Sequence, residues 1–497
     1  MASNILNVLE NVEKGRQNCI KNAKLANLPA TDNMDIFNIG NLFLEQNNTE
    51  FVEEEGPWVR PSDWWDTKSI LENAQNIEQD GVVYFPTYII LLNNSTDTAM
   101  LKKSQTSGDT TSADGYVFSD EPDILYVGDQ THTWDASKDK PCSEGYSTRY
   151  IIAYMIDRNI ANTIKFYNNL PILELIFGNI IFPNSQRQLT VSQNQTIVNI
   201  ETTEKTVLEY YQITSSIEGD VNLKNISLPT TTMIGTFTGF RNVPTLISFS
   251  AQNLNRINQS SFLTDVRSLR YIDIPNVTYI NYGSLTGSYL KSIELPSLTE
   301  LSYSVFDNST NLKSIVLPNL TKCSGMLYNC YNLKEVNMPA LEEITTTGGN
   351  YFIYSCFNLE TLSFPVLKKV SKQMCAACYN LKEVSIPQLE TMTAPSNFSN
   401  CYSLTEFTFP NTFLSLTQPT QFQGCVNLNT INLVTNWRWS LNVKDTDLTH
   451  ECIIDMFNKL KDLTGADSLT LTIGANNLAK VTDEELQIPN SKNWTVQ

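Results

Sequence analysis

Residues 290–296 read LKSIELP, and the same heptapeptide returns as LKSIVLP from Leu312, LKEVNMP from Leu333 and LKEVSIP from Leu381. More divergent copies begin at Leu223, Leu246, Leu269, Leu359, Leu404 and Leu428. The leading leucines are 21 to 26 residues apart. A fixed period of this length predicts a solenoid, in which each repeat forms one coil and stacks on its neighbours.

Within the heptapeptide, the first, fourth and sixth positions are apolar and the seventh is usually proline. Side chains alternate between the two faces of a strand, so Ile293 and Leu295 are expected to point into the core. Proline cannot donate a ladder hydrogen bond and ends the strand. A second apolar pair follows, as in Leu298 and Leu301. The pattern predicts a β-rich leucine-rich-repeat solenoid of about ten coils over residues 223–441.

Cysteine occupies the position three residues before the leading leucine in five successive repeats. These residues are Cys330, Cys356, Cys378, Cys401 and Cys425. Cys375 and Cys378 also have the Cys-x-x-Cys spacing of a redox or zinc pair. The repeat alignment places both at positions that neighbouring repeats fill with Phe, Leu or Cys, so we interpret them as small core residues. We therefore predict no metal site and no cofactor.

Taken together, the repeat has the form Phe-x-x-Cys-x-Asn-Leu-x-x-Ile-x-Leu-Pro. This phrase resembles the BspA-like bacterial leucine-rich-repeat family over about residues 223–433. The resemblance implies the solenoid fold and, since members of that family are surface adhesins and related proteins, a role in binding.

The remaining sequence predicts four further segments. Residues 1–55 are expected to form a helical attachment module, and residues 56–160 a small β-sandwich. The sandwich segment resembles polycystic-kidney-disease-type domains through Asp114-Gly115, His132-Thr133-Trp134-Asp135 and Gly145-Tyr146. Residues 161–222 are interpreted as an irregular transition or first coils, and residues 442–497 as an α/β cap.

The cap begins with a helix after Thr449, which we expect Gly465 to end, followed by a strand over residues 468–474. Thr482 and Glu485 have the spacing of a capping box. Residues 447–496 resemble a carboxy-terminal module of phage and prophage repeat proteins, and residues 14–28 resemble short helical modules of phage tail proteins.

Charge and hydropathy exclude several classes of function. The net charge is −18 and no basic run is present, which disfavours a nucleic-acid partner. We expect no membrane insertion, since no apolar stretch approaches the ~20 residues of a membrane span, and the opening residues lack the apolar core of a secretory signal. The two histidines, His132 and His450, lie in different segments, which argues against a histidine-based triad.

Two other chemistries remain as minor alternatives. Outward-facing acids of the repeats provide a glycosidase hypothesis, which requires two carboxylates ~5 to 10 Å apart. These acids are Glu294, Glu335, Glu383 and Glu406. A polar stretch offers oxygen ligands for calcium without EF-hand spacing. Its acids are Asp109, Asp114, Asp120, Glu121 and Asp123.

Aromatic residues provide the candidate binding sites. The position two before the leading leucine is aromatic in four consecutive repeats, at Tyr331, Phe357, Tyr379 and Tyr402. Coils are ~5 Å apart, so these rings are expected to form a ladder, which either holds the coils together or contacts a ligand. The 26-residue repeat inserts extra residues over 345–354, and a loop containing Tyr351 and Phe352 is the second candidate.

We therefore expect a non-enzymatic phage virion protein, a tail-associated fibre or adhesin. Its amino-terminal region would contact other virion proteins, and its solenoid would contact a host cell-surface glycan or protein. A homotrimer is a further hypothesis, because fibre proteins are commonly trimers. The alternatives are a bacterial surface adhesin of the BspA-like type and a glycan depolymerase.

Overall fold

The structure is a computed structural model. It describes residues 57–93, 147–156, 172–178, 197–204, 222–234, 243–346, 348 and 351–497, with short strands at 117–118, 124–127, 140–141, 164–166, 189–191 and 210–211. The chain divides into two compact units, Met1–Gly56 and Pro57–Gln497, and the description below concerns the second. The predicted helical module over residues 1–55, the motifs at His132 and Gly145 and the acids of the calcium hypothesis lie outside the described residues.

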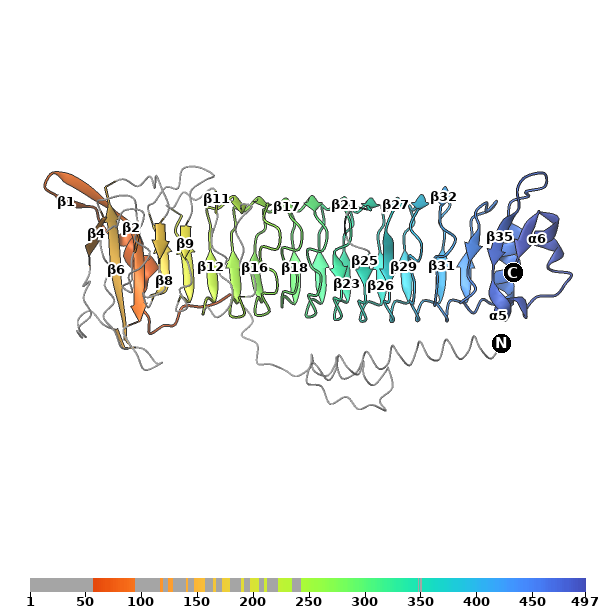
Figure 1. Cartoon of the computed structure of the whole chain (residues 1–497), viewed down its shortest axis with the longest axis horizontal. Helices are drawn as coiled ribbons and strands as arrows, with labels where there is room; N and C mark the ends of the chain where they lie inside the picture. The colour runs from red at the N-terminus through yellow and green to blue at the C-terminus, as the bar shows by residue number, and fades with distance from the viewer. Residues whose placement is uncertain are drawn as a thin grey trace, which may run out of the picture. The chain divides into compact units, whose positions relative to one another are not determined.

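Within the second unit, the repeats form parallel coils in the order of the sequence (Figure 1). The heptapeptide strands make up the first row: β8 (Ile172–Phe177), β10 (Asn199–Thr202), β12 (Asn225–Ser227), β14 (Ser248–Ser250), β16 (Tyr271–Asp273), β18 (Ser292–Glu294), β20 (Ser314–Val316), β23 (Glu335–Asn337), β26 (Thr361–Ser363), β29 (Glu383–Ser385), β31 (Glu406–Thr408) and β33 (Thr430–Asn432). Ile293 pairs with Ile315, which pairs with Val336, so the repeat phase sets the register. The leucine-rich-repeat solenoid is confirmed, and β8 and β10 add coils before residue 223.

The second apolar pair of each repeat forms a second row of strands. Its members are β11 (Tyr210–Tyr211), β13 (Met233–Ile234), β15 (Arg256–Ile257), β17 (Tyr279–Ile280), β19 (Glu300–Leu301), β21 (Lys322–Cys323), β24 (Glu343–Ile344), β27 (Lys369–Val370), β30 (Thr391–Met392) and β32 (Ser415–Leu416). A third row is short: β22 (Leu327–Tyr328), β25 (Tyr351–Tyr354) and β28 (Gln373–Ala376). Most of the buried apolar side chains of the three rows belong to one continuous core, while Ile176 and Leu173 of β8 lie in two smaller clusters.

Cys375 and the five cysteines that stand three residues before a leading leucine are completely buried in this core, and none of them forms a disulfide. Burial raises the pKa of Cys375, which keeps its thiol protonated and unreactive. Among the described residues, no group of three or more His, Cys, Asp or Glu side chains is arranged to hold a metal ion. The Cys-x-x-Cys spacing therefore arises from two core positions of one repeat.

The solenoid begins with an antiparallel arrangement. The long strand β2 (Val82–Asn93) pairs with β6 (Ser147–Met155) on one side and with β8 on the other, and β4 (Ile124–Val127) extends the same sheet beyond β6. Strands β1 (Ile77–Gln79) and β5 (Lys140–Pro141) also pair within it, while β3 (Val117–Phe118), β7 (Ile164–Phe166) and β9 (Leu189–Val191) form a separate sheet. The large sheet thus continues across residue 160, where the sequence predicts the end of a β-sandwich.

Residues 57–73, which end in helix α3 (Thr67–Asn73), pack on this first part of the sheet. Arg60 Nε donates to the buried carboxylate of Glu174 over 2.6 Å. From there, polar side chains continue in register: Asn199 donates to Glu174 over 2.9 Å, Asn225 to Asn199 over 2.8 Å, and Ser248 to Asn225 over 2.5 Å. This chain satisfies polar groups that would otherwise be costly to bury.

The carboxy-terminal segment is the predicted α/β cap. Helix α4 (His450–Lys459) contacts β33, and β34 (Leu441–Asn442), β35 (Leu469–Thr472) and β36 (Trp494–Val496) form a parallel sheet beside the short helices α5 (Gly474–Leu478) and α6 (Gln487–Ser491). Thr449 caps α4 by accepting from the Cys452 amide. The prediction that Gly465 ends this helix is wrong, because Leu460 already adopts an extended conformation.

The capping box of the cap is confirmed. Glu485 accepts from the Thr482 amide over 2.8 Å, and the Glu485 amide donates to the Thr482 hydroxyl over 3.2 Å. Glu485 also contacts His450 Nε2 at 2.8 Å. None of the helices in the described part of the chain has the length and apolarity to span a bilayer.

Candidate ligand-binding surfaces

The four aromatic residues before the leading leucines form a stack through consecutive coils, which we call the aromatic ladder: Tyr331, Phe357, Tyr379 and Tyr402. Successive ring centroids are 5.0, 4.9 and 4.9 Å apart, with interplanar angles of 9°, 13° and 13°. The first three rings are half-buried, and Tyr402 is 41% exposed. The structure therefore brings together all four residues that the sequence singles out.

The stacking decides which part of each ring a ligand can reach. Phe357 and Tyr379 have a neighbouring ring on both faces, so these faces are occupied by the protein. At these two inner rings a ligand can therefore reach only the ring edges, whereas Tyr331 and Tyr402 each have one stacked neighbour in the ladder. A ligand along this strip would make edge and hydrogen-bond contacts, while the stacking itself holds successive coils together.

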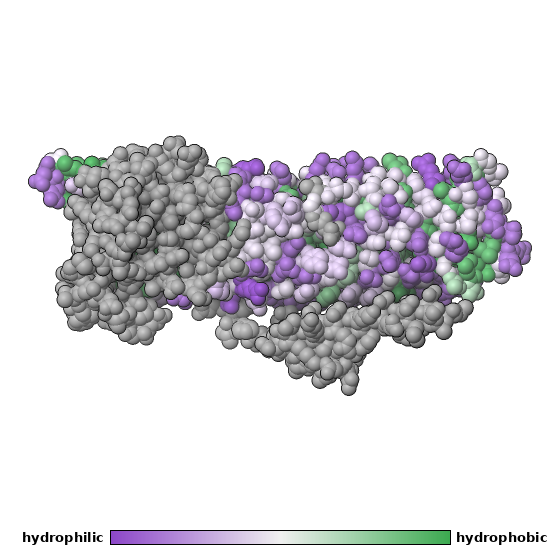
Figure 2. Space-filling view, viewed as in Figure 1, coloured by the Kyte–Doolittle hydropathy of each residue, from purple (hydrophilic) through white to green (hydrophobic). Residues whose placement is uncertain are grey.

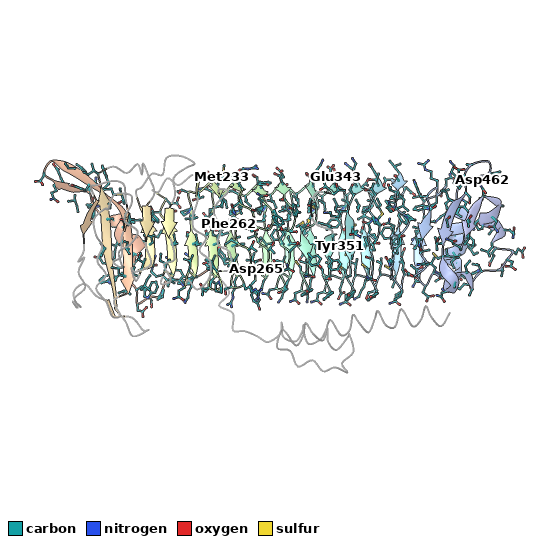
Figure 3. All side chains as sticks on the ribbon, in the orientation of Figure 1. Met233, Phe262, Asp265, Glu343, Tyr351 and Asp462 are labelled. Carbon is teal, nitrogen blue, oxygen red and sulfur yellow. The ribbon has the colours of Figure 1, made fainter. Side chains whose placement is uncertain are left out.

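A second group of aromatic residues lies on the third row of strands. Tyr328 stacks on Tyr354 with centroids 4.7 Å apart and an interplanar angle of 6°, and Tyr351 contacts Tyr354 at 4.4 Å. Tyr328 is 39% exposed, and Tyr351 and Tyr354 are half-buried. We call these three residues the tyrosine cluster. Figure 3 marks Tyr351 on the coils midway along the solenoid.

The structure separates the two residues of the predicted loop. Tyr351 belongs to the tyrosine cluster, whereas Phe352 is completely buried and packs against Phe364 at 5.8 Å. A ligand at the surface cannot contact Phe352, so its place in the candidate loop is corrected to a core position. In β25 the two middle residues, Phe352 and Ile353, are buried, while Tyr351 and Tyr354 at its ends are half-buried.

Two charged residues lie beside the tyrosine cluster. Asp307 accepts a hydrogen bond from the Tyr328 amide over 2.9 Å. Burial raises the pKa of Asp307, while the hydroxyl of Ser304, the Tyr328 amide and the charge of Lys372 oppose this shift. Lys372 is only 6% exposed, and burial lowers the pKa of its ammonium, against the attraction of Asp307. A half-buried carboxylate and a buried cation therefore accompany the rings.

The four acids of the glycosidase hypothesis lie on the first row of strands. Glu383 and Glu406 occupy the same repeat position on neighbouring strands, and both are exposed. Glu406 accepts from Asn432 Nδ2 over 2.8 Å. Glu294 is opposite Val316, and Glu335 is opposite Ser314. These acids lie on a solvated strand surface, where charged residues mainly keep the protein soluble.

The view in Figure 2 shows where polar and apolar residues gather on one face of the described surface. Hydrophilic residues predominate along the coils, and apolar residues are more frequent toward the carboxy-terminal segment. The exposed large apolar side chains include Leu414 and Val426. Val426 follows Tyr402 in the ladder position of the next repeat, so the exposed end of the ladder is apolar.

Comparison with known proteins identifies the repeats. The chain matches the family model described as BspA type leucine-rich repeat region in 6 copies, over residues 211–325, 255–382 and 299–429. No curated protein matches the sequence. No enzyme family is indicated by the family comparison.

Solved structures similar to this chain include bacterial leucine-rich-repeat proteins. A protein from Bacteroides ovatus is 15% identical, with 75% of this chain and 98% of that chain covered and a TM-score of 0.33. The pneumococcal vaccine antigen PcpA is 12% identical, with 68% and 94% covered and a TM-score of 0.34. A leucine-rich cell surface protein from Faecalibacterium prausnitzii is 11% identical, with 66% and 93% covered and a TM-score of 0.24.

Proposed function

Because residues 211–429 form a BspA-type leucine-rich-repeat region, we propose that the chain is a non-enzymatic binding protein whose coils present a surface to a receptor on a cell. The observation that supports this most directly is the aromatic ladder, which places partly exposed rings about 4.9 Å apart on consecutive coils. Aromatic side chains at a surface supply much of the contact energy in protein interfaces. The ladder edge and the tyrosine cluster are the proposed contact surfaces.

We place this function in a phage particle, as a tail-associated fibre or adhesin. The support is the resemblance of residues 447–496 and 14–28 to modules of phage proteins. In this role residues 1–55 attach the chain to other virion proteins, and the solenoid contacts a glycan or protein of the host. A bacterial surface adhesin is the second candidate, and the BspA-type family match favours it.

The two locations are tested by looking for the chain itself. Mass spectrometry of purified phage particles should detect its peptides at a constant ratio to the tail proteins. Labelling of intact bacteria with a reagent that does not cross the membrane should leave the chain unlabelled until lysis. Labelling on intact cells, with no peptides in particles, contradicts the phage assignment and supports the bacterial one.

The binding function is tested with the purified chain. Fluorescently labelled protein should coat host cells, and the combined substitution of Tyr331, Tyr379 and Tyr402 by alanine should reduce the coating. Tyr279→Ala, a half-buried tyrosine of the second row, is the matched control. Equal coating by the ladder variant and the control would remove the ladder edge from the contact surface. Shortened host glycan after incubation would instead support the depolymerase alternative.

A further inference from the structure

The register of the coils places an acid and two rings in one column. Asp307, Tyr328 and Tyr354 each stand five residues before a leading leucine. The Asn308 amide donates to the Tyr328 carbonyl over 2.6 Å, and the Asn329 amide donates to the Tyr354 carbonyl over 2.9 Å. The three side chains therefore leave neighbouring coils at equivalent points, about 4.8 Å apart.

Tyr328 is the last ring of this column on the side of Asp307. Tyr354 covers one face of the Tyr328 ring, with the two planes only 6° from parallel. The other face turns toward the coil that carries Asp307, and among the described residues no second ring stacks on it. The 39% exposure of Tyr328 is consistent with a ring that has one open face. This differs from the middle of the aromatic ladder, where both faces are occupied.

Asp307 supplies a hydrogen-bond acceptor beside that open face. Its carboxylate accepts from the Tyr328 amide over 2.9 Å, and the side chain of Ser304 also donates to it. A carboxylate has about four acceptor positions, and Asp307 uses part of them for these two donors and lies near the ammonium of Lys372. These contacts fix the carboxylate of Asp307 beside the ring of Tyr328.

We propose that the open face of Tyr328 and the carboxylate of Asp307 form a subsite for one neutral pyranose unit of a surface glycan. This inference rests on the proposed binding function and specifies its ligand. The C–H face of a pyranose ring packs on an aromatic ring, and its adjacent hydroxyl groups donate to the carboxylate. Binding sites of this kind combine an apolar platform with a few fixed polar groups.

The charges at the site favour a neutral sugar over an acidic one. The ligand meets the half-buried carboxylate of Asp307, whereas the balancing ammonium of Lys372 is 6% exposed and lies below the surface. The chain as a whole carries a net charge of −18. A uronic acid or sialic acid would therefore be repelled at short range and at long range.

The test uses a panel of methyl glycosides of glucose, galactose, mannose and N-acetylglucosamine, with glucuronic acid as the acidic probe. Binding to the full chain is followed by ligand-observed NMR. We expect at least one neutral glycoside to bind, with its C–H protons close to the protein. Tyr328→Ala and Asp307→Asn should each weaken that binding about tenfold or more, which corresponds to about 1.4 kcal/mol.

Two further variants separate a lost subsite from a damaged fold. Tyr328→Phe keeps the ring face and should bind within about threefold of the unchanged chain. Tyr282→Ala is a matched control, because Tyr282 is 40% exposed, contacts Tyr303 with ring centroids 4.4 Å apart, and belongs to neither the tyrosine cluster nor the aromatic ladder. It should leave glycoside binding unchanged. All variants are first shown by circular dichroism to be folded, and binding is compared at a temperature well below the thermal unfolding midpoint of each variant.

The inference is overturned if no neutral glycoside binds, if Tyr328→Ala binds as well as the unchanged chain, or if glucuronic acid binds more tightly than glucose. The coating of host cells is measured in parallel. Coating that persists in Tyr328→Ala, without glycoside binding, removes the subsite and leaves the binding function intact. Absence of coating by the unchanged chain counts against the proposed function instead.

Discussion

Replacing Phe357 by alanine tests whether the aromatic ladder holds the coils together. Phe357 is an inner ring, and it stacks on Tyr331 at 5.0 Å and on Tyr379 at 4.9 Å. Aromatic pairs contribute about 0.5–1.5 kcal/mol each beyond the area they bury. Loss of both stacks should therefore lower the free energy of unfolding by about 1–3 kcal/mol. Tyr402→Ala removes one stack at the end of the ladder and should cost about half as much.

The assay is urea unfolding followed by circular dichroism, with Phe357→Leu as the companion variant. Leucine retains most of the buried apolar area and removes the stacking, so the difference between the two variants separates the two contributions. A double-mutant cycle of Phe357 with Tyr379 should give a coupling energy of about 0.5–1.5 kcal/mol. A coupling energy of zero, or equal losses for Phe357→Ala and Tyr402→Ala, would refute the stacking argument.

Three other predictions follow from the buried and terminal groups. Arg60→Ala leaves the buried carboxylate of Glu174 without its cation and should cost about 3–5 kcal/mol, measured as a fall in the denaturation midpoint; an unchanged midpoint would show that the pair is not needed. Cys375 and Cys378 should resist alkylation by iodoacetamide in the native chain and react only after unfolding, as mapped by peptide mass spectrometry; rapid native alkylation would contradict their burial. Hydrogen bonds from the Thr482 amide and from His450 lower the pKa of Glu485. The ionised carboxylate therefore stabilises the cap at a pH above its ordinary pKa, and this stabilisation is lost as the pH falls through the lowered pKa. In thermal unfolding scans from about pH 7 to 3, the unfolding midpoint of Glu485→Gln should fall less than that of the unchanged chain.

The repeat region shows how much of the structure the sequence contains. Counting from the leading leucine correctly predicts that Ile293 points inward, that Cys378 is a core residue, and that Tyr331 and Tyr402 lie in one row. All of these features depend only on the position of a residue within its repeat, because the parallel register pairs equivalent positions of neighbouring coils. Asp307 and Tyr328 also share a repeat position, five residues before a leading leucine. Their column could have been predicted from the same alignment of the repeats.

Other features depend on contacts that no periodicity encodes. Strand β2 pairs with β8 through Ile89 and Ile176, which are far apart in the sequence and belong to different patterns. The orientation of Phe352 depends on the extra residues of its coil, since an added residue reverses which side chain of a strand faces inward. The open face of Tyr328 depends on its neighbours in space, which become visible only once the register is known.

The antiparallel strands β2, β4 and β6 at the beginning of the large sheet affect how copies of this chain can associate head to tail. A stack of parallel coils offers a strand edge at each end, and copies that join head to tail through such edges do not close and grow into filaments. Here β2 runs against β8, β6 runs against β2, and the short β4, which runs against β6, is the outermost described strand of this sheet, while α4 contacts β33 in the carboxy-terminal cap. A copy that approaches the β4 end with a strand parallel to the coils therefore meets a strand of the opposite direction, which disfavours head-to-tail growth through a parallel strand edge at this end.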